Sequence, residues 1–543
     1  MRIVALLFVS SGFGILLWGQ QAASINLHTT PATKNDMSPD LKTLHRPVSE
    51  ANQVREMYRP GPVPLPKRER GAAAERVLEH APPPPFELEA VEIDSFSGIA
   101  VGQAGLSGVP PDTNGSVGRT AYVQSVNDAF AVFAKDTHQM LSGYIDGSGF
   151  TLAPFDARSL WNGFGGGCEL ANHGDPIVLF DKVADRWLVS QLGMPAGGPY
   201  SECIAISATA DATSRYYRYE FQFQKAPDFK ASAFNDYPKF GVWPDGYYAT
   251  FNMFDKPVNG SSQGARLCSF ERDKMLVGQP ASMQCAQMPA SIGGVLPADL
   301  DGSTLPPPHS PAYFLNFGDQ VLRLWRLHID WTNDKNSTLS NPPQLLKTAS
   351  FDYFCTSETS KRPKPCVVQP GTNEKLDSLS DRLMYRLAYR NFEDHESLVV
   401  NHTVKAGNSS GIRWYEIRTS PGEPSVYQSG TLAPDAAFRW MGSIAMDKAG
   451  GILLGYSVSD NTTFPSIRFA GRSSGDPKWA LSVEKELQSG HGSQPADRWG
   501  DYSSMSVDPA DDCTFWFTSQ IQPSTAVKNW ETIISRLRIA SCH

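Results

Sequence analysis

The chain has 543 residues, of which 41% are hydrophobic, 11% aromatic and 19% charged, with 45 Gly and 41 Pro. This composition is typical of many short strands joined by turns, and it argues against long amphipathic helices. The formal net charge is −8 at pH 7 and the Lys and Arg residues are scattered, so the sequence offers no basic face for a nucleic-acid partner.

The first segment predicts export. Met1 and Arg2 precede an apolar run from Ile3 to Trp18, and residues 20–24 are small or polar, as a signal peptidase requires. The run is short for a membrane span, so an uncleaved anchor is the less favoured alternative. We expect a signal peptide over residues 1–24, no membrane span after its cleavage, and a secreted or cell-surface, extracytoplasmic protein.

Residues 25–88 are polar and rich in proline, as in RPGPVPLPKRERG and APPPPFE. Such a stretch has too few large apolar side chains to bury a core. We expect it to be a disordered leader, with a propeptide or a spacer from the cell surface as the functional alternatives.

Seven later stretches share one pattern, and the intervals between them are 63, 61, 63, 82, 61 and 59 residues. A steady period is the mark of a repeat fold, and the longer fourth interval fits an inserted loop. The residues that open the seven stretches are Asp112, Asp175, Asp236, Asp299, Asp381, Gly442 and Asp501.

Each stretch reads as an apolar strand, a short polar turn and a second strand, as in GDPIVLFDKVADRWLVSQL at 174–192. A second hairpin follows in several repeats, which gives four strands per repeat. We therefore predict an all-β chain in which residues 89–543 form a β-propeller of seven four-stranded blades. The last repeat holds only three strands, so we expect the N-terminal strand at 88–101 to complete the last blade and close the ring.

The eight cysteines fall into sequential near pairs, without the CxxC spacing of a zinc or redox site. In an exported chain this pattern predicts four disulfides. The expected pairs are Cys168 with Cys203, Cys268 with Cys285, Cys355 with Cys366, and Cys513 with Cys542. No cofactor fingerprint is present, since the glycine run at 165–167 lacks the Lys and Ser/Thr of a phosphate-binding loop.

The first strand of each propeller blade lies innermost, so the residues that open it converge on one central mouth. Crowded carboxylates there would raise some pKa values while cations lower others, as acid and base catalysis requires. Asp175, Asp381 and Asp501 are the candidate acid/base groups. The candidate ligand-binding residues are His173, Asp112, Asp236, Tyr237, Arg382, Arg439, Trp440, Arg498 and Tyr502.

Two other interpretations of these residues stay open. Asp or Asn at the start of a strand often only hydrogen-bonds a neighbouring backbone, and Arg beside Trp often forms a strut between blades. Four of the carboxylates, Asp112, Asp175, Asp381 and Asp501, also suit a structural Ca²⁺.

Several strings, among them PPDTNGSVG, GDPIVLFDKVADRWLVSQ, SDRLMYRLAYRNF and RWGDYSSMSVDP, resemble a group of secreted bacterial propeller proteins of unassigned activity. The resemblance covers residues 105–543 and implies export and a propeller fold, without catalytic residues to carry over. The architecture also resembles sialidase-type propellers. The chain departs from those, because it has no clear SxDxGxxW motif and almost no Glu at the strand openings.

Two functions follow. The first is a secreted monomer that binds a glycan or protein ligand at its central mouth. The second is a secreted glycoside hydrolase or polysaccharide lyase, in which the aspartates act as acid and base and Arg439 and Arg498 hold an anionic sugar. The fold alone does not decide whether the protein is an enzyme, and binding is the slightly favoured hypothesis.

Overall fold

The computed structural model describes residues 25–45, 63–65, 79–103, 108–127, 129–170, 174–223, 233–356 and 364–543. The expected signal peptide lies outside these residues. The described part is all-β, as predicted, and its helical elements are short. No helix in it is long and apolar enough to cross a membrane. These elements are α1 (Gly166–Leu170), α2 (Arg272–Met275), η1 (Leu41–Thr43), η3 (Ala157–Trp161) and η4 (Asp334–Asn336).

Three antiparallel sheets come first, and each follows the chain strand by strand. Their strands are short, apolar and bounded by turns, which is why they form where the repeats predict them. The first sheet holds β4 (Asn114–Val117), β5 (Ala121–Val126), β6 (Ala129–Ala134) and β9 (Phe155–Asp156), with the hairpin β7 (Gly143–Asp146) and β8 (Gly149–Leu152) beside it. The second holds β10 (Ile177–Asp181), β11 (Arg186–Gly193), β12 (Ser201–Ser207) and β13 (Tyr216–Gln222). The third holds β14 (Phe234–Trp243), β15 (Gly246–Phe254), β16 (Ser262–Phe270) and β17 (Ser282–Gln287).

The fourth and fifth repeats share one nine-stranded sheet instead of forming two separate four-stranded ones. The join is a parallel pairing of β18 with β23, in which Ala298 lies opposite Leu387. The strands are β18 (Leu296–Asp301), β19 (Ala312–Phe317), β20 (Val321–His328), β21 (Thr338–Leu339) and β22 (Gln344–Lys347), followed by β23 (Met384–Asn391), β24 (Glu396–Ala406), β25 (Ser409–Ser420) and β26 (Ser425–Leu432).

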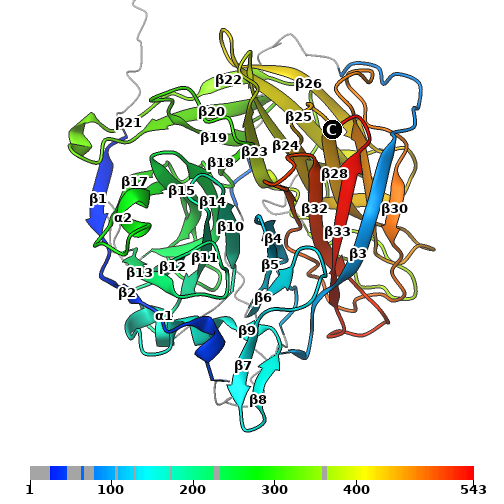
Figure 1. Ribbon diagram of the computed structural model, residues 1–543. Coiled ribbons are helices and arrows are strands. Elements are labelled where there is room, and N and C mark those ends of the chain that lie inside the picture. Colours follow the sequence, from blue (N-terminus) through cyan, green and yellow to red (C-terminus); the bar gives the residue numbers. More distant parts are fainter. Residues whose placement is uncertain are drawn as a thin grey trace, which may run out of the picture.

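The last two sheets have four strands each, and the final one contains the expected N-terminal strand. β3 (Ala90–Ala100) runs antiparallel to β33 (Glu531–Ile539), and Figure 1 shows blue β3 beside red β33. The other strands are β27 (Phe438–Met446), β28 (Ile452–Ser459), β29 (Ser466–Arg472), β30 (Lys485–Gln488), β31 (Ser504–Val507) and β32 (Thr514–Ile521).

The described start of the leader, residues 25–45, differs from the expectation of disorder. β1 (Leu27–Pro31) pairs with β17 and β2 (Lys34–Met37) pairs with β13, so each adds a fifth strand to a sheet. Figure 1 shows the dark blue leader along these two edges. The reason is that β13 and β17 are edge strands with free N–H and C=O groups, which a polar segment can pair without a hydrophobic core of its own. We name residues 25–45 the belt.

The buried apolar side chains gather between neighbouring sheets. One cluster joins the first and second sheets through residues such as Val123 and Val189, and another joins the second and third through Phe221 and Phe270. A further cluster joins the first and last sheets, where the Tyr122 ring stacks on Trp516 with centroids 5.2 Å apart. Each sheet therefore buries its faces against its neighbours, as stacked blades do.

The four predicted disulfides are all present. Cys168 bonds to Cys203, Cys268 to Cys285, Cys355 to Cys366, and Cys513 to Cys542. The described residues contain no free cysteine.

Candidate functional site

Residues at or near the start of five first strands share one backbone conformation. Asp112, Asp175, Tyr237, Met441 and Asp501 all have φ between 49° and 60°, in the left-handed region. Non-glycine residues rarely occupy this region, and Asp is among the few that tolerate it. The recurrence marks an irregular backbone at the same end of these strands: Tyr237 and Met441 lie at β-bulges within β14 and β27, whereas the three aspartates precede β4, β10 and β31.

Three carboxyl groups lie at the centre of the group. Asp175 accepts a hydrogen bond from the Tyr237 N–H at 3.0 Å and another from the Tyr502 hydroxyl at 3.2 Å. Asp112 is 1% exposed, and neither of its oxygens accepts an N–H or hydroxyl hydrogen bond within the described residues. Its carboxyl lies close enough to Asp175 for the two to share a hydrogen bond when one is protonated. Asp236, which is partly exposed, is close enough to Asp175 for their charges to interact.

A lysine lies between two tyrosine rings beside these carboxyls. The Nζ of Lys239 is 3.7 Å from the centroid of Tyr237 and 3.8 Å from that of Tyr502, and it donates to the Pro238 carbonyl at 2.8 Å. The side chain is fully buried. Cation–π contact holds an ammonium in this position, while the loss of water favours the neutral amine.

Two ion pairs flank the carboxyls. The Nε of Arg382 contacts Asp381 at 2.7 Å, and its guanidinium lies 4.5 Å from the Tyr237 ring. Arg498 pairs with Asp501 in the same way. We name the whole group the entrance cluster: Asp112, Asp175, Asp236, Tyr237, Lys239, Asp381, Arg382, Arg498, Asp501 and Tyr502.

The electrostatics of the cluster favour protonated acids and a neutral amine. Burial and the neighbouring Asp175 raise the pKa of Asp112 well above its usual range and that of Asp236 to about 7. Burial lowers the pKa of Lys239 to about 7, although Asp175 and Asp112 act in the opposite direction. The cluster therefore holds an acid and an amine that both titrate near neutral pH, which is a common property of functional sites.

Glu202 is a member of this neighbourhood that the sequence did not reveal. Its carboxyl accepts a hydrogen bond from the Asn235 side chain at 3.1 Å, and burial raises its pKa well above the usual range. It lies on β12, away from the strand openings. The one available signal was a charged residue inside the apolar run SECIAIS. Lys239 belongs to the string NDYPK (residues 235–239) at the third strand opening, and the sequence assigned it no catalytic or ligand-binding role.

Two predicted ligand-binding residues lie elsewhere. Arg439 is fully buried and binds Glu484 through two nitrogens, at 2.7 and 2.8 Å, and Asp435 at 2.8 Å. Trp440 is fully buried in an apolar cluster beside Trp499. Both side chains are therefore engaged inside the fold and lie outside the entrance cluster. His173 lies outside the described residues.

A metal site is not apparent. In the described segments, no three His, Cys, Asp or Glu side chains are grouped as a metal ion would need. Of the four carboxylates that suit Ca²⁺, Asp381 and Asp501 each have an arginine partner.

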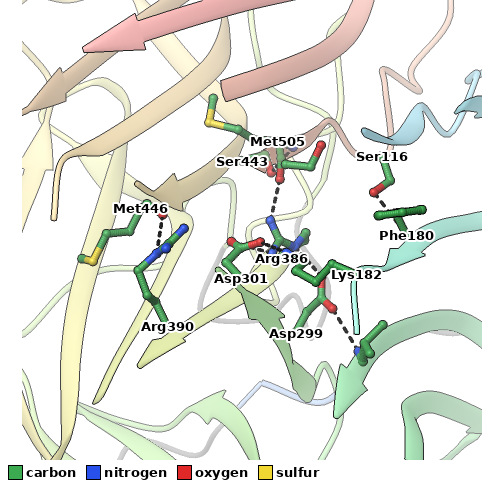
Figure 2. A network of polar contacts seen from close by, with 12 residues as sticks. Ser116, Phe180, Lys182, Asp299, Asp301, Arg386, Arg390, Ser443, Met446 and Met505 are labelled. Atoms are coloured by element: carbon green, nitrogen blue, oxygen red, sulfur yellow. Dashed lines mark hydrogen bonds and ion pairs between the residues drawn. The ribbon is translucent and has the colours of Figure 1, made fainter. Parts of the chain in front are cut away.

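A second polar group lies toward the other end of the first strands (Figure 2). Arg386 binds Asp299 at 2.6 Å and Asp301 at 2.7 Å, Lys182 binds Asp301 at 2.9 Å, and Arg386 also donates to the Met505 carbonyl. First strands from five repeats surround this network, which lines a cavity of about 10 Å³. That volume admits roughly one water molecule, so this cavity is too small for a sugar ring.

No family model matches the chain, and no curated protein matches it. Some solved structures show a weak likeness. A Dyadobacter fermentans protein of unknown function is 11% identical over 67% of this chain and 94% of its own, with a TM-score of 0.32. An endo-arabinase from Bacteroides thetaiotaomicron is 14% identical over 55% of this chain and 94% of its own, with a TM-score of 0.27. A Trypanosoma rangeli sialidase is 11% identical over 67% of this chain and 54% of its own, with a TM-score of 0.33.

Proposed function

We propose that this protein binds a hydroxyl-rich ligand, such as an extracellular glycan, at the entrance cluster. The observation that carries the proposal is the buried Asp112 carboxyl beside Asp175. Buried carboxyl oxygens normally have hydrogen-bond donors, and Asp112 has no N–H or hydroxyl donor among the described residues. A ligand hydroxyl supplies the missing donor and accepts from a protonated carboxyl at the same time.

The partly exposed members of the cluster give a ligand its first contacts. Asp175, Asp236, Arg382 and Arg498 retain some solvent exposure, whereas Asp112 and Lys239 lie beneath them. The two arginines offer planar donors to hydroxyl or carboxylate groups, and both signs of charge are present. This arrangement suits neutral or acidic sugars, and a protein ligand that presents such groups is the alternative.

The test measures tryptophan fluorescence and calorimetric titration with a panel of neutral and acidic oligosaccharides. The decisive variant is Asp175→Asn, because Asn tolerates φ of 49° and keeps an acceptor for the Tyr237 N–H. We expect it to weaken binding at least about tenfold. Asp136→Asn, on an exposed residue, is the matched control and leaves affinity unchanged. Equal affinity in both variants contradicts the proposed site.

A second candidate function is acid–base cleavage of a glycosidic bond, by hydrolysis or elimination. It is favoured by Asp236 and Lys239, whose pKa values both lie at about 7. The test is release of new reducing ends from the same oligosaccharides between pH 5 and 9. A bell-shaped rate profile that loses one limb in Asp236→Asn favours catalysis, and binding without turnover favours the first candidate.

We also propose the fold, the export and the oligomeric state of the protein that carries this site. A closed ring of seven blades, with the nine-stranded sheet counted as two, is supported by contacts from each first strand to the next and from β31 back to β4. Residues 89–543 then form one propeller domain.

Export is supported by the four disulfides, and the test is N-terminal sequencing of secreted protein, which we expect to begin after residue 24. Light scattering tests the expected monomer.

A further inference from the structure

A short piece of the proline-rich leader lies at the edge of the entrance cluster. Residues 63–65, Val-Pro-Leu, are described in the structure, and Val63 is only 2% exposed. Leu65 packs against the apolar cluster that β18 and β19 share with β23. Burial of this kind is unusual in a polar, proline-rich stretch, and it shows that the segment has a specific seat.

Two glycines form the seat. A Cβ on Gly293 would lie 2.8 Å from the Val63 Cγ1 and 3.3 Å from the Pro64 Cδ, whereas the nearest atom outside the leader, Asn252 Oδ1, is 3.5 Å away. The φ of Gly293 is not in the left-handed region, so its backbone conformation does not require glycine. The missing side chain at this position therefore accommodates the leader.

The neighbouring Gly294 connects the seat to the cluster. It has φ of +62°, and its N–H donates to Asn252 at 2.9 Å. The position of a Cβ on Gly294 is 2.9 Å from the Arg382 Cβ and 3.7 Å from the Val63 Cγ1. Val63 thus packs within one residue's width of Arg382, the arginine that contacts Asp381 and the Tyr237 ring.

We propose that residues 63–65 are a built-in occupant of the mouth, which restricts access to the entrance cluster until the segment is released. The inference concerns regulation of the site assigned above, and it rests on that assignment. When Val63 is bound in its seat, it occupies the space beside Arg382 at the edge of the entrance cluster. A ligand therefore competes with an apolar segment of the same chain. Tethering gives that segment a high effective concentration and makes its weak contacts sufficient.

The test uses Gly293→Ala, whose added methyl group collides with Val63 while its closest contact outside the leader is at ordinary van der Waals distance. The matched control is Gly475→Ala, because a Cβ there has no neighbour within 4 Å and φ is unrestricted. Val63→Cys in both backgrounds reports seating through the rate at which iodoacetamide modifies the introduced thiol. Carbodiimide labelling of Asp175 and Asp236, mapped by mass spectrometry, reports opening of the mouth.

We expect Gly293→Ala to raise both the thiol rate and the labelling of Asp236 at least about tenfold over Gly475→Ala, in line with loss of a buried valine's transfer free energy. Val63→Ser, which leaves the sheets intact, raises the labelling in the same direction. A faster thiol rate with unchanged carboxyl labelling overturns the inference, as does a thiol that reacts fast in the control. If labelling rises but no oligosaccharide binds either variant, the regulated access stands and the proposed glycan function fails.

Discussion

Single residues in the entrance cluster link stability to pH in an unusual way. Asp236 holds its proton to about pH 7 in the folded chain, whereas an unfolded Asp loses it near pH 4. Between these values the folded state binds more protons, so stability falls as the pH rises. Lys239 loses its proton near pH 7 when folded and near pH 10.5 when unfolded, so its contribution raises stability above pH 7.

The first prediction concerns this profile. The free energy of unfolding, measured by urea titration from pH 4 to 10, should pass through a minimum near pH 7 from these two groups. Asp236→Asn should flatten the acid limb, by up to about 1.4 kcal/mol per pH unit for one proton. Lys239→Met should flatten the limb above pH 7 instead. Identical profiles for the wild type and both variants contradict the titration assigned to these residues.

The second prediction contrasts two buried aspartates. Asp112→Asn should stabilise the protein by about 1–3 kcal/mol at alkaline pH, where the buried Asp112 carboxyl without N–H donors would otherwise have to ionise beside Asp175. Asp301→Asn should destabilise it by a similar amount. Burial opposes ionisation of Asp301, but Arg386 and Lys182 lower its pKa to about 2, so its contribution is present above pH 4 and lost as the pH falls toward 2. Thermal melting and urea unfolding of both variants decide the signs.

At this scale the sequence located most of the cluster and predicted that crowding raises some of its carboxyl pKa values. The strand-opening positions were readable from the period, and nine of the predicted residues lie in the entrance cluster. Arg439 and Trp440 lie outside the cluster because their side chains contact Glu484 and the apolar cluster around Trp499, and the repeat does not encode side-chain direction. Asp112 and Asp175 could not be recognised as a carboxyl pair, since their approach depends on packing between two sheets.

At the scale of elements, one glutamine side chain ties the first sheet to the last. Gln124 on β5 accepts the Ile99 N–H of β3 at 2.7 Å and donates to Thr518 and Thr532, on β32 and β33. Thr532 in turn donates to the Ile99 carbonyl at 2.7 Å. All four residues are buried. A buried backbone N–H needs an acceptor, so Gln124 supports the position of β3 directly.

The third prediction follows from that contact. Gln124→Leu should lower the free energy of unfolding by about 2 kcal/mol, because it leaves the Ile99 N–H without its acceptor. Hydrogen exchange should quicken first in β3 and the facing part of β33. The control Gln139→Leu changes an exposed glutamine on the same sheet's border and should alter neither quantity. Unchanged hydrogen exchange in β3 would falsify the proposal that Gln124 holds β3 in position.

The pairing of the N-terminal strand was predictable for a simple reason. The last repeat lacked a strand and residues 88–101 supplied one, so counting was enough. The parallel join of β18 to β23 was not predictable in this way, because parallel pairing leaves no mark in the alternation of either strand. The disulfides were also readable, since each bond links cysteines that are near neighbours along the chain.

At the scale of the whole molecule, the belt binds sheets that come later in the sequence. Arg218 on β13 pairs with Asp36 at 2.7 Å, and Leu41 is fully buried in the cluster between the first and second sheets. Composition suggested disorder because the belt has no core of its own. The belt is ordered because the sheets provide strand edges and an apolar core for it. The amino-acid composition of a segment does not show whether such a partner exists elsewhere in the chain.

The fourth prediction measures what the belt contributes. Leu41→Ala should lower the free energy of unfolding by about 2–4 kcal/mol, since it empties a fully buried site. Exchange of β13 amides should quicken with it, because β2 then pairs less firmly along that edge. Leu345→Ala, at a leucine that is 59% exposed, serves as the control and should cost little. Equal free energies of unfolding for the two variants would show that the belt does not contribute to stability.

The pairing of early segments with late ones sets the order in which this molecule can be completed during synthesis. Ser95 on β3 lies 2.8 Å from Ser535 on β33, across 440 residues of chain. At roughly 5–20 residues per second, a ribosome needs about 20–90 s to make the partner after β3 has emerged. Throughout that time β3 waits as an unpaired strand and the first sheet keeps one apolar face open to water. The unpaired strand and the open apolar face make the incomplete chain prone to aggregation, and the final sheet assembles only when β33, the last strand made, reaches β3.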